Sequence, residues 1–333
     1  MPEPSASPKR RGRLLRCGAA CVVLSAVAGY VVVQYVTGGA GAPGCRVVSA
    51  ETAAAYEFTP EQAVNAATIA AVGTNRNMPR RAVTIALATA LQESALRNLD
   101  HGDRDSLGLF QQRPSQGWGS AQEVTDPAYA ANIFYEHLAK VPDYTELPLT
   151  VAAQRVQRSG YPEAYAKHEP DAALLAAALT GTSAASLTCD GRPAAATAAA
   201  TATGPDAVRA ALVRDFGRDA LQQAGAEVGG VQASAADGAP PVAETGGRTV
   251  TLPVAGQTAA DGREAAERGW QLAHWAVANA SALRIERVTY AGREWVAGHT
   301  GSTWRATGST EAAGATGAGA GGGTGSVRIV TAQ

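Results

Sequence analysis

The 333-residue sequence predicts a mainly α fold: one N-terminal transmembrane helix, then a helical domain, then a small C-terminal α+β module. Three observations support this prediction. A basic cluster is followed by an apolar run over residues 17–36, which is long enough to cross a membrane. Apolar residues recur at helical spacing across residues 55–189, without an alternating stretch of any length. Short alternating segments flank a helical pattern within residues 248–333.

The N-terminus carries the signals of a membrane anchor. Residues 1–16 form a basic tail, with positive charges at Lys9, Arg10, Arg11, Arg13 and Arg16. Positive charge ahead of an apolar span favours a cytoplasmic N-terminus, so we expect a single-pass protein of the cell membrane whose other domains are extracytoplasmic. A cleaved signal peptide is the alternative, but no small-x-small site directly follows the apolar run, which is also long for a signal core. Residues 37–54 are expected to be a spacer.

Helix-start signals divide the next region into helices. Thr59 and Gln62 have the pattern of a capping box around a first-turn proline, which predicts a helix over residues 60–72. Asp126, followed by a proline, begins another helix that ends near residue 141. Further helices are expected over residues 80–97, 149–158 and 170–180.

Glu93 is the residue of this region whose surroundings indicate chemistry. On a helical wheel its side chain lies over a small and largely apolar surface near the helix end, formed by Ile85, Ala86, Thr89 and Ala90. Desolvation there raises the pKa of a carboxyl group toward the value that a general acid needs. The alternative is an ordinary solvated ion pair, because Glu93 and Arg97 are four residues apart.

The polar loop after this helix does not predict a metal site, and no cofactor is expected. Asp100, Asp103 and Asp105 miss the spacing of a calcium loop, so a solvated loop is the better interpretation. The scattered histidines have no spacing typical of metal ligands.

Two motifs at this spacing resemble one known family. A helix ending in Gln-Glu-Ser at residues 92–94 is followed by Ser-x-Gly-Leu-Phe-Gln at residues 106–111. This pairing resembles the soluble lytic transglycosylase and goose-type lysozyme branch of the lysozyme-like superfamily, over roughly residues 59–181. The third motif of that family, Ala-Tyr-Asn followed by Gly, departs here to Ala-Ala-Gln-Arg at residues 152–155, ahead of Gly160 and Tyr161.

The resemblance implies a lysozyme-like fold for residues 55–189, with Glu93 as the catalytic acid and base. It also implies sugar contacts by residues in and after these motifs, namely Ser94, Ser106, Gln111, Gln112, Trp118 and Tyr161. Trp118 lies between two glycines, where it either anchors the loop in the core or stacks on a sugar ring.

The activity that the resemblance implies is cleavage of peptidoglycan glycan strands. A lytic transglycosylase needs only the one glutamate, whereas lysozyme-like hydrolysis requires a second carboxylate, for which only the loop over residues 100–105 has candidates. A non-catalytic peptidoglycan-binding or cell-wall scaffolding protein with the same fold is the alternative. A transporter is disfavoured, because a single span without ionisable residues cannot enclose a pathway.

Two further features bear on organisation and partners. Cys45 and Cys189 lie outside the membrane and bracket the helical domain, which predicts a disulfide between them. The net charge of −1, without a basic face, gives no reason to expect nucleic-acid binding. The sequence does not indicate protein partners.

The C-terminal third combines a linker with a small module. Residues 190–247 are rich in Ala, Thr, Gly and Pro, with one possible helix over 206–223. In the module over residues 248–333, strands are expected at 249–254, 285–290 and 326–330, and a helix at 261–280. Residues 273–279 and 288–295 resemble a module found on actinobacterial cell-wall hydrolases. His274 and His299 are interpreted as core or surface histidines, because they lack ligand spacing.

Overall fold

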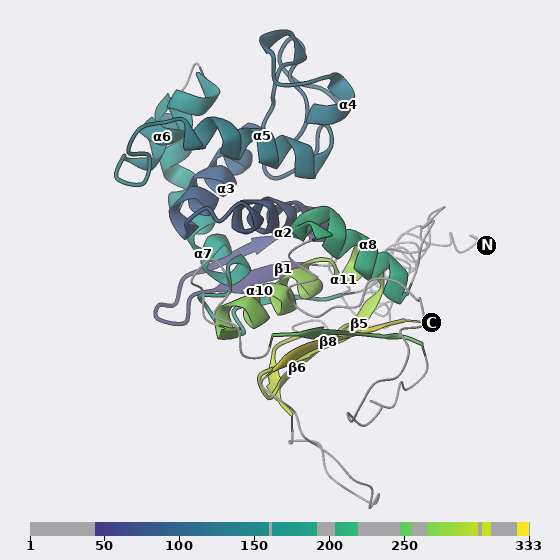
Figure 1. The fold of residues 1–333 in the computed structure, drawn as a ribbon. Helices are drawn as coiled ribbons and strands as arrows, with labels where there is room; N and C mark the ends of the chain where they lie inside the picture. Colours follow the sequence, from purple (N-terminus) through teal and green to yellow (C-terminus); the bar gives the residue numbers. More distant parts are fainter. Residues whose placement is uncertain are drawn as a thin grey trace, which may run out of the picture. The chain divides into compact units, whose positions relative to one another are not determined.

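The structure, a computed structural model, describes residues 44–159, 162–191, 204–218, 247–254, 265–298, 302–307 and 325–332. About half of these residues are helical and two small sheets accompany the helices, so the fold is mixed α+β rather than mainly α (Figure 1). Among the residues described, none of the helices has the length and apolar character needed to cross a bilayer. The transmembrane helix predicted over residues 17–36 lies outside them.

The first half of the described chain is built from helices that begin at the predicted caps. Thr59 and Gln62 form the reciprocal capping box, and the Asp126 side chain accepts hydrogen bonds from the backbone N–H groups of Ala128 and Tyr129. The helices are α2 (Pro60–Asn75), α3 (Arg80–Ser94), α4 (Ala121–Val124), α5 (Pro127–Ala139), α6 (Leu149–Gln157) and α7 (Glu169–Leu179), with short 3₁₀ turns η1 (Pro114–Gln116) and η2 (Pro162–His168).

Helix α2 continues past Gly73, where the sequence predicts a stop. A Cβ atom at this position would lie 2.6 Å from the Tyr135 hydroxyl, so the glycine lets α5 approach α2 closely. Close approach of the helices agrees with a core rich in alanine, including buried stretches of both α2 and α3.

Helix α3 ends earlier than predicted, at Ser94. Ala95 and Leu96 both have positive φ, 52° and 59°, so the chain leaves the helix through two left-handed residues. This conformation is unusual without glycine or asparagine, which is why the sequence did not indicate it. Arg97 therefore lies beyond the helix, and the four-residue spacing that suggested an ion pair with Glu93 does not apply.

A three-stranded antiparallel sheet brings together the two ends of the helical region. Its strands β1 (Cys45–Val48), β2 (Ala55–Phe58) and β3 (Leu187–Cys189) lie in the order β2-β1-β3. The expectation of helices alone is wrong here, because strands of three or four residues are too short to show alternation. Cys45 and Cys189 are directly opposite each other in the β1–β3 register and form the predicted disulfide.

A five-stranded antiparallel sheet forms the C-terminal part, in the order β4-β8-β5-β6-β7. Strand β5 has the predicted bounds, whereas β6 and β7 were not predicted as strands. One face of the sheet is buried beneath helix α10, as Figure 1 shows. The elements are α8 (Pro205–Phe216), β4 (Thr249–Pro253), α10 (Ala265–Ala278), α11 (Ala280–Leu283), β5 (Ile285–Tyr290), β6 (Arg293–Val296), β7 (Arg305–Ala306) and β8 (Ser326–Thr331).

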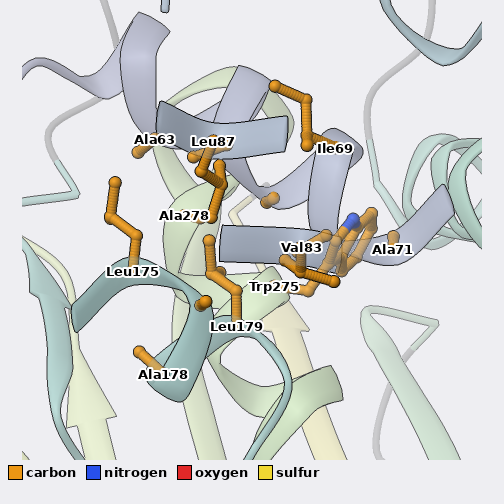
Figure 2. Close-up of a cluster of buried hydrophobic side chains, with 14 of the residues drawn as sticks. Ala63, Ile69, Ala71, Val83, Leu87, Leu175, Ala178, Leu179, Trp275 and Ala278 are labelled. Carbon is orange, nitrogen blue, oxygen red and sulfur yellow. The ribbon is translucent and has the colours of Figure 1, made fainter. Parts of the chain in front are cut away.

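Helix α10 packs against both halves, and the described residues from Gly44 onward belong to one compact unit. Trp275 of α10 lies in a buried cluster with Val83 of α3 and Leu179 of α7 (Figure 2). Gly181 allows the end of α7 to approach the backbone of α10, since a Cβ there would lie 1.8 Å from the Glu267 carbonyl oxygen.

Buried polar groups connect the same elements. His274 of α10 is fully buried; its Nδ1 donates to the Ala178 carbonyl (2.8 Å) and its Nε2 accepts from the Ser186 N–H (3.2 Å). The Asp215 carboxylate of α8 accepts hydrogen bonds from the Trp275 indole (2.8 Å) and from the Thr68 hydroxyl of α2 (3.3 Å). Through these bonds α8 and α10 are joined to the helical part.

Candidate active site around Glu93

Glu93 occupies the last turn of α3 and is only half-exposed. The Tyr165 hydroxyl of η2 donates to its Oε1 at 2.6 Å. The Gln157 side chain of α6 also acts on the Glu93 carboxyl as a hydrogen-bonding neighbour that lowers its pKa, and its Nε2 donates to the Phe110 carbonyl oxygen at 2.7 Å. The carboxyl is thus held by residues of two other elements, and Tyr165 is 72 residues away from it in the sequence.

The net effect of the surroundings is to raise the pKa of the Glu93 carboxyl. Burial raises the pKa of Glu93 above its ordinary value, while the hydrogen bonds from Tyr165 and Gln157 act in the opposite direction. Burial and the neighbouring Glu93 charge raise the pKa of Tyr165 far above neutral, so its hydroxyl stays a donor. Arg97 approaches the Ser94 carbonyl instead (3.4 Å), and no ion pair to Glu93 occurs among the described residues.

Ser94 fixes the loop that covers the helix end. Its side chain is buried, and its Oγ lies 2.7 Å from the Leu109 carbonyl oxygen and 3.0 Å from that of Ala90. Because Leu109 belongs to the second motif and Ala90 to α3, the Ser94 hydroxyl connects the second motif to this helix. The structure therefore places Ser94 beneath the site, next to Glu93 in sequence but facing the protein.

The polar residues of the second motif also contact the protein. Ser106 is buried, and its backbone N–H donates to the Asp103 carbonyl at 3.0 Å. Gln111 is half-buried, and its Nε2 lies 3.3 Å from the His101 carbonyl oxygen. Gln112 is buried and donates to the Ala130 carbonyl at 3.1 Å. Together they hold the loop in one conformation, and Gln111 keeps part of its surface exposed.

Trp118 lies at the other side of this loop, against α5. Its ring packs on that of His137 with centroids 4.3 Å apart, and the Tyr129 hydroxyl donates to its carbonyl at 3.3 Å. The indole stays half-exposed, so it is anchored on one side and open to solvent on another. Tyr161 lies outside the described residues.

The acidic loop residues do not assemble with Glu93. Asp100 is almost fully exposed and pairs with His101 at 2.7 Å. Asp105 pairs with Arg113 at 2.8 Å and accepts the Ser115 N–H at 2.9 Å, and the guanidinium holds the pKa of that carboxyl well below its usual range. Among the described residues, no other carboxylate interacts with Tyr165 and Gln157 as that of Glu93 does.

Tyr165 and Gln157 are the site residues that sequence reasoning missed. Gln157 lies two residues after the segment that departs from the family's third motif, and Tyr165 lies a few residues after Tyr161. The departure from the motif marks this region but selects neither residue. Their selection depends on how α6 and η2 pack against α3, which no local pattern encodes.

Comparison with known families concerns the other half of the chain. The family model described as VldE, C-terminal domain, matches residues 210–316, about a third of the sequence. The match begins within α8 and includes α10 and β5, and Glu93 lies outside it. No curated protein matches the chain. The similarity to the VldE C-terminal domain is therefore confined to the part that contributes α10 to the shared core.

Proposed function

We propose that this protein is a membrane-anchored, extracytoplasmic enzyme that cleaves peptidoglycan glycan strands, with a lysozyme-like helical domain and Glu93 as general acid and base. The observation that carries the proposal is the state of the Glu93 carboxyl. It is desolvated, it has no cationic partner among the described residues, and it accepts a 2.6 Å hydrogen bond from a tyrosine hydroxyl. A carboxyl group with a raised pKa is the expected acid for a glycosidic oxygen.

The proposed reaction begins with proton transfer. Protonated Glu93 donates to the glycosidic oxygen as the bond from that oxygen to the anomeric carbon breaks, and the leaving sugar departs as an alcohol. The Tyr165 hydroxyl and the Gln157 amide can then stabilise the carboxylate that forms, because both are positioned as donors to it.

The second step returns the proton to Glu93. The Glu93 carboxylate accepts the proton of the 6-hydroxyl on the sugar that carries the anomeric carbon, and the oxygen of that hydroxyl bonds to the anomeric carbon and closes a 1,6-anhydro ring. The glutamate recovers its proton, so the cycle needs no other reactant.

We favour this transglycosylase outcome over hydrolysis. A hydrolytic enzyme of this type uses a second carboxylate to position water or to form a covalent intermediate. The oxygens of Asp105 are occupied by Arg113 and Ser115, and Asp100 is exposed beside His101. These contacts support a mechanism that relies on Glu93 alone.

The products distinguish the two outcomes. The full-length protein, purified in detergent, is incubated with purified cell-wall sacculi, and the released fragments are analysed by mass spectrometry. We expect muropeptides with 1,6-anhydro ends. Muropeptides with reducing ends indicate hydrolysis instead.

A glycan-binding protein without catalysis is the second candidate. It is motivated by the departure of residues 152–155 from the third motif of the family that the sequence resembles. Co-sedimentation with sacculi and no release of fragments would support this candidate and exclude the enzyme.

A further inference from the structure

A cavity of about 600 Å³ lies apart from Glu93, between strand β2 and the first turns of α3 and α7. Its lining includes Ala55 of β2 and Arg80, Arg81 and Thr84 of α3, and α7 contributes Glu169 and Asp171. Glu93, Tyr165 and Gln157 do not line it. The cavity is therefore a second candidate site with its own set of charges.

Two of these charges are paired with each other and two are not. Arg81 Nη1 lies 2.6 Å from Glu169, and Arg81 Nη2 donates to the Leu147 carbonyl at 3.1 Å, so this pair forms a fixed wall. Arg80 is exposed, and the partner it has among the described residues is a neutral group, the Thr182 hydroxyl, at 3.1 Å. The half-buried Asp171 carboxylate has no ion-pair partner within the described part of the chain. The cavity thus offers one cation and one anion to a ligand.

The wall formed by β2 adds main-chain hydrogen-bonding groups. Strand β2 is the edge of its sheet, so its side away from β1 is not paired within the sheet. An extended peptide can add to such an edge through backbone hydrogen bonds. A ligand with a peptide backbone, a carboxylate and an ammonium group would satisfy all three features.

The cavity lies at the first turns of α3, and Glu93 lies in the last turn of the same helix. Arg81 lies eleven residues, or about three helical turns, before Gln92, so these two side chains leave α3 on the same side, whereas Glu93 leaves the helix about 100° further around. The separation along the helix is about 17 Å at 1.5 Å per residue. A peptide of about five extended residues spans that length. His168, which contacts Gln92 at 3.1 Å, directly precedes Glu169, so polar groups connect the two places.

We propose that this cavity binds the peptide stem of peptidoglycan while its glycan lies at Glu93. Stem peptides are short and carry free carboxylates, and many carry the free amine of a diamino acid. The stem carboxylate pairs with Arg80, the ammonium pairs with Asp171, and the backbone extends along β2. This inference rests on the proposed function, because peptidoglycan is the substrate that supplies both parts.

The test uses a synthetic stem tetrapeptide with a diamino acid at its third position and no sugar. Its affinity for the full-length protein in detergent is measured by isothermal titration calorimetry. We expect Asp171→Asn and Arg80→Gln each to weaken binding about tenfold or more, as loss of a charged hydrogen bond does. Glu61→Gln, an exposed carboxylate in the first turn of α2 that does not line the cavity, is the matched control and should bind as the wild type does.

A second ligand keeps the test independent of folding in the variants. The same peptide with its amine acetylated and its carboxylates amidated should bind the wild-type protein at least about tenfold more weakly. Equal affinity for the two peptides, unchanged affinity in both cavity variants, or no binding of the free peptide overturns the inference. If wall fragments are released but the peptide does not bind, the proposed peptide site is wrong and the proposed enzyme is not affected. If the peptide binds in a charge-dependent way but no fragments are released, the proposed enzyme is wrong and the peptide site is not affected.

Discussion

The pKa of the Glu93 carboxyl is subject to two opposing influences. Burial raises its pKa, whereas donors from Tyr165 and Gln157 lower it. A general acid works best when its pKa is close to the working pH, so the balance between these influences sets the pH range of activity. The tyrosine is the group through which this balance can be changed with the least disturbance, because replacing it with phenylalanine removes only an oxygen.

Tyr165→Phe should therefore move the pH profile of activity. Loss of the hydrogen bond removes an influence that lowers the pKa of Glu93, so the alkaline limb of the rate profile should shift to higher pH. The rate on purified walls is measured at a series of pH values. Tyr129→Phe, which removes a hydroxyl that contacts Trp118, is the control. An alkaline limb that stays in place or shifts to lower pH contradicts the assignment of Tyr165.

At the scale of elements, the site depends on the junction between α3 and the loop that follows it. The helix ends through the left-handed residues Ala95 and Leu96, and the Ser94 hydroxyl then joins the helix to Leu109. This junction fixes the loop against the helix end that carries Glu93. The Ser94 hydroxyl therefore supports the site from within the protein, whereas the sequence resemblance implies that it contacts the sugar.

Ser94→Ala tests this assignment. The change leaves the buried Leu109 carbonyl without its donor, which should lower the free energy of unfolding by about 1–3 kcal/mol. Chemical denaturation compares it with Thr303→Ala, which removes an exposed hydroxyl outside the helices and strands and should have little effect. If Ser94→Ala is as stable as the wild type and affects only sugar binding, the hydroxyl belongs to the ligand.

The elements with local signals were the ones that the sequence could predict. The Thr59 capping box, the Asp126 cap and strand β5 follow from residue types at fixed spacing, and all three are confirmed. Strands β1 and β2 were missed because four residues carry too little pattern. The end of α3 was missed because alanine and leucine rarely adopt positive φ.

Local sequence patterns could likewise predict only part of the candidate site. The desolvated surroundings of Glu93 follow from the small residues one turn away on its own helix. Tyr165 and Gln157 reach the carboxyl from other elements, and their selection depends on long-range packing. The inward hydrogen bonds of Ser94 and Gln112 likewise depend on contacts with Leu109 and Ala130.

In the molecule as a whole, the C-terminal part packs directly on the helical part. Indole N–H groups of Trp295 and Trp304 donate to the backbone carbonyls of Cys189 (3.1 Å) and Leu187 (2.9 Å), so strand β3 is bound by both. That strand also carries the disulfide to Cys45. Stability of the helical part and docking of the C-terminal part are therefore expected to change together.

Removing the disulfide should expose this coupling. In the chain-entropy model a bridge across 144 residues contributes about 4–5 kcal/mol, so the double variant Cys45→Ser, Cys189→Ser should unfold at a markedly lower denaturant concentration. Far-UV circular dichroism and tryptophan fluorescence follow the transition. Because Trp295 contacts Cys189, both signals should change together, and separate transitions would contradict the coupling.

His274 should make stability depend on pH. Burial lowers its pKa to about 4, so the unfolded chain binds a proton at higher pH than the folded protein does. Its contribution is complete above pH ~6.5 and is lost as the pH falls toward 4, a decrease of about 3 kcal/mol. Urea denaturation between pH 7.5 and 4.5 measures the loss, and it should be smaller in His274→Gln. A free energy of unfolding that is constant or increases over that range contradicts the buried neutral histidine.

The most direct measurement of the central claim is the rate at which wild-type and Glu93→Gln protein release anhydro-ended fragments from purified walls. Glutamine preserves the shape of the side chain but cannot donate the proton, so the variant should be slower by about 10²- to 10⁴-fold. Arg97→Gln is a matched control, because it changes an exposed charge beside the site and should leave the rate nearly unchanged. Equal rates for the wild type and Glu93→Gln, with both proteins folded, would show that Glu93 is not the acid.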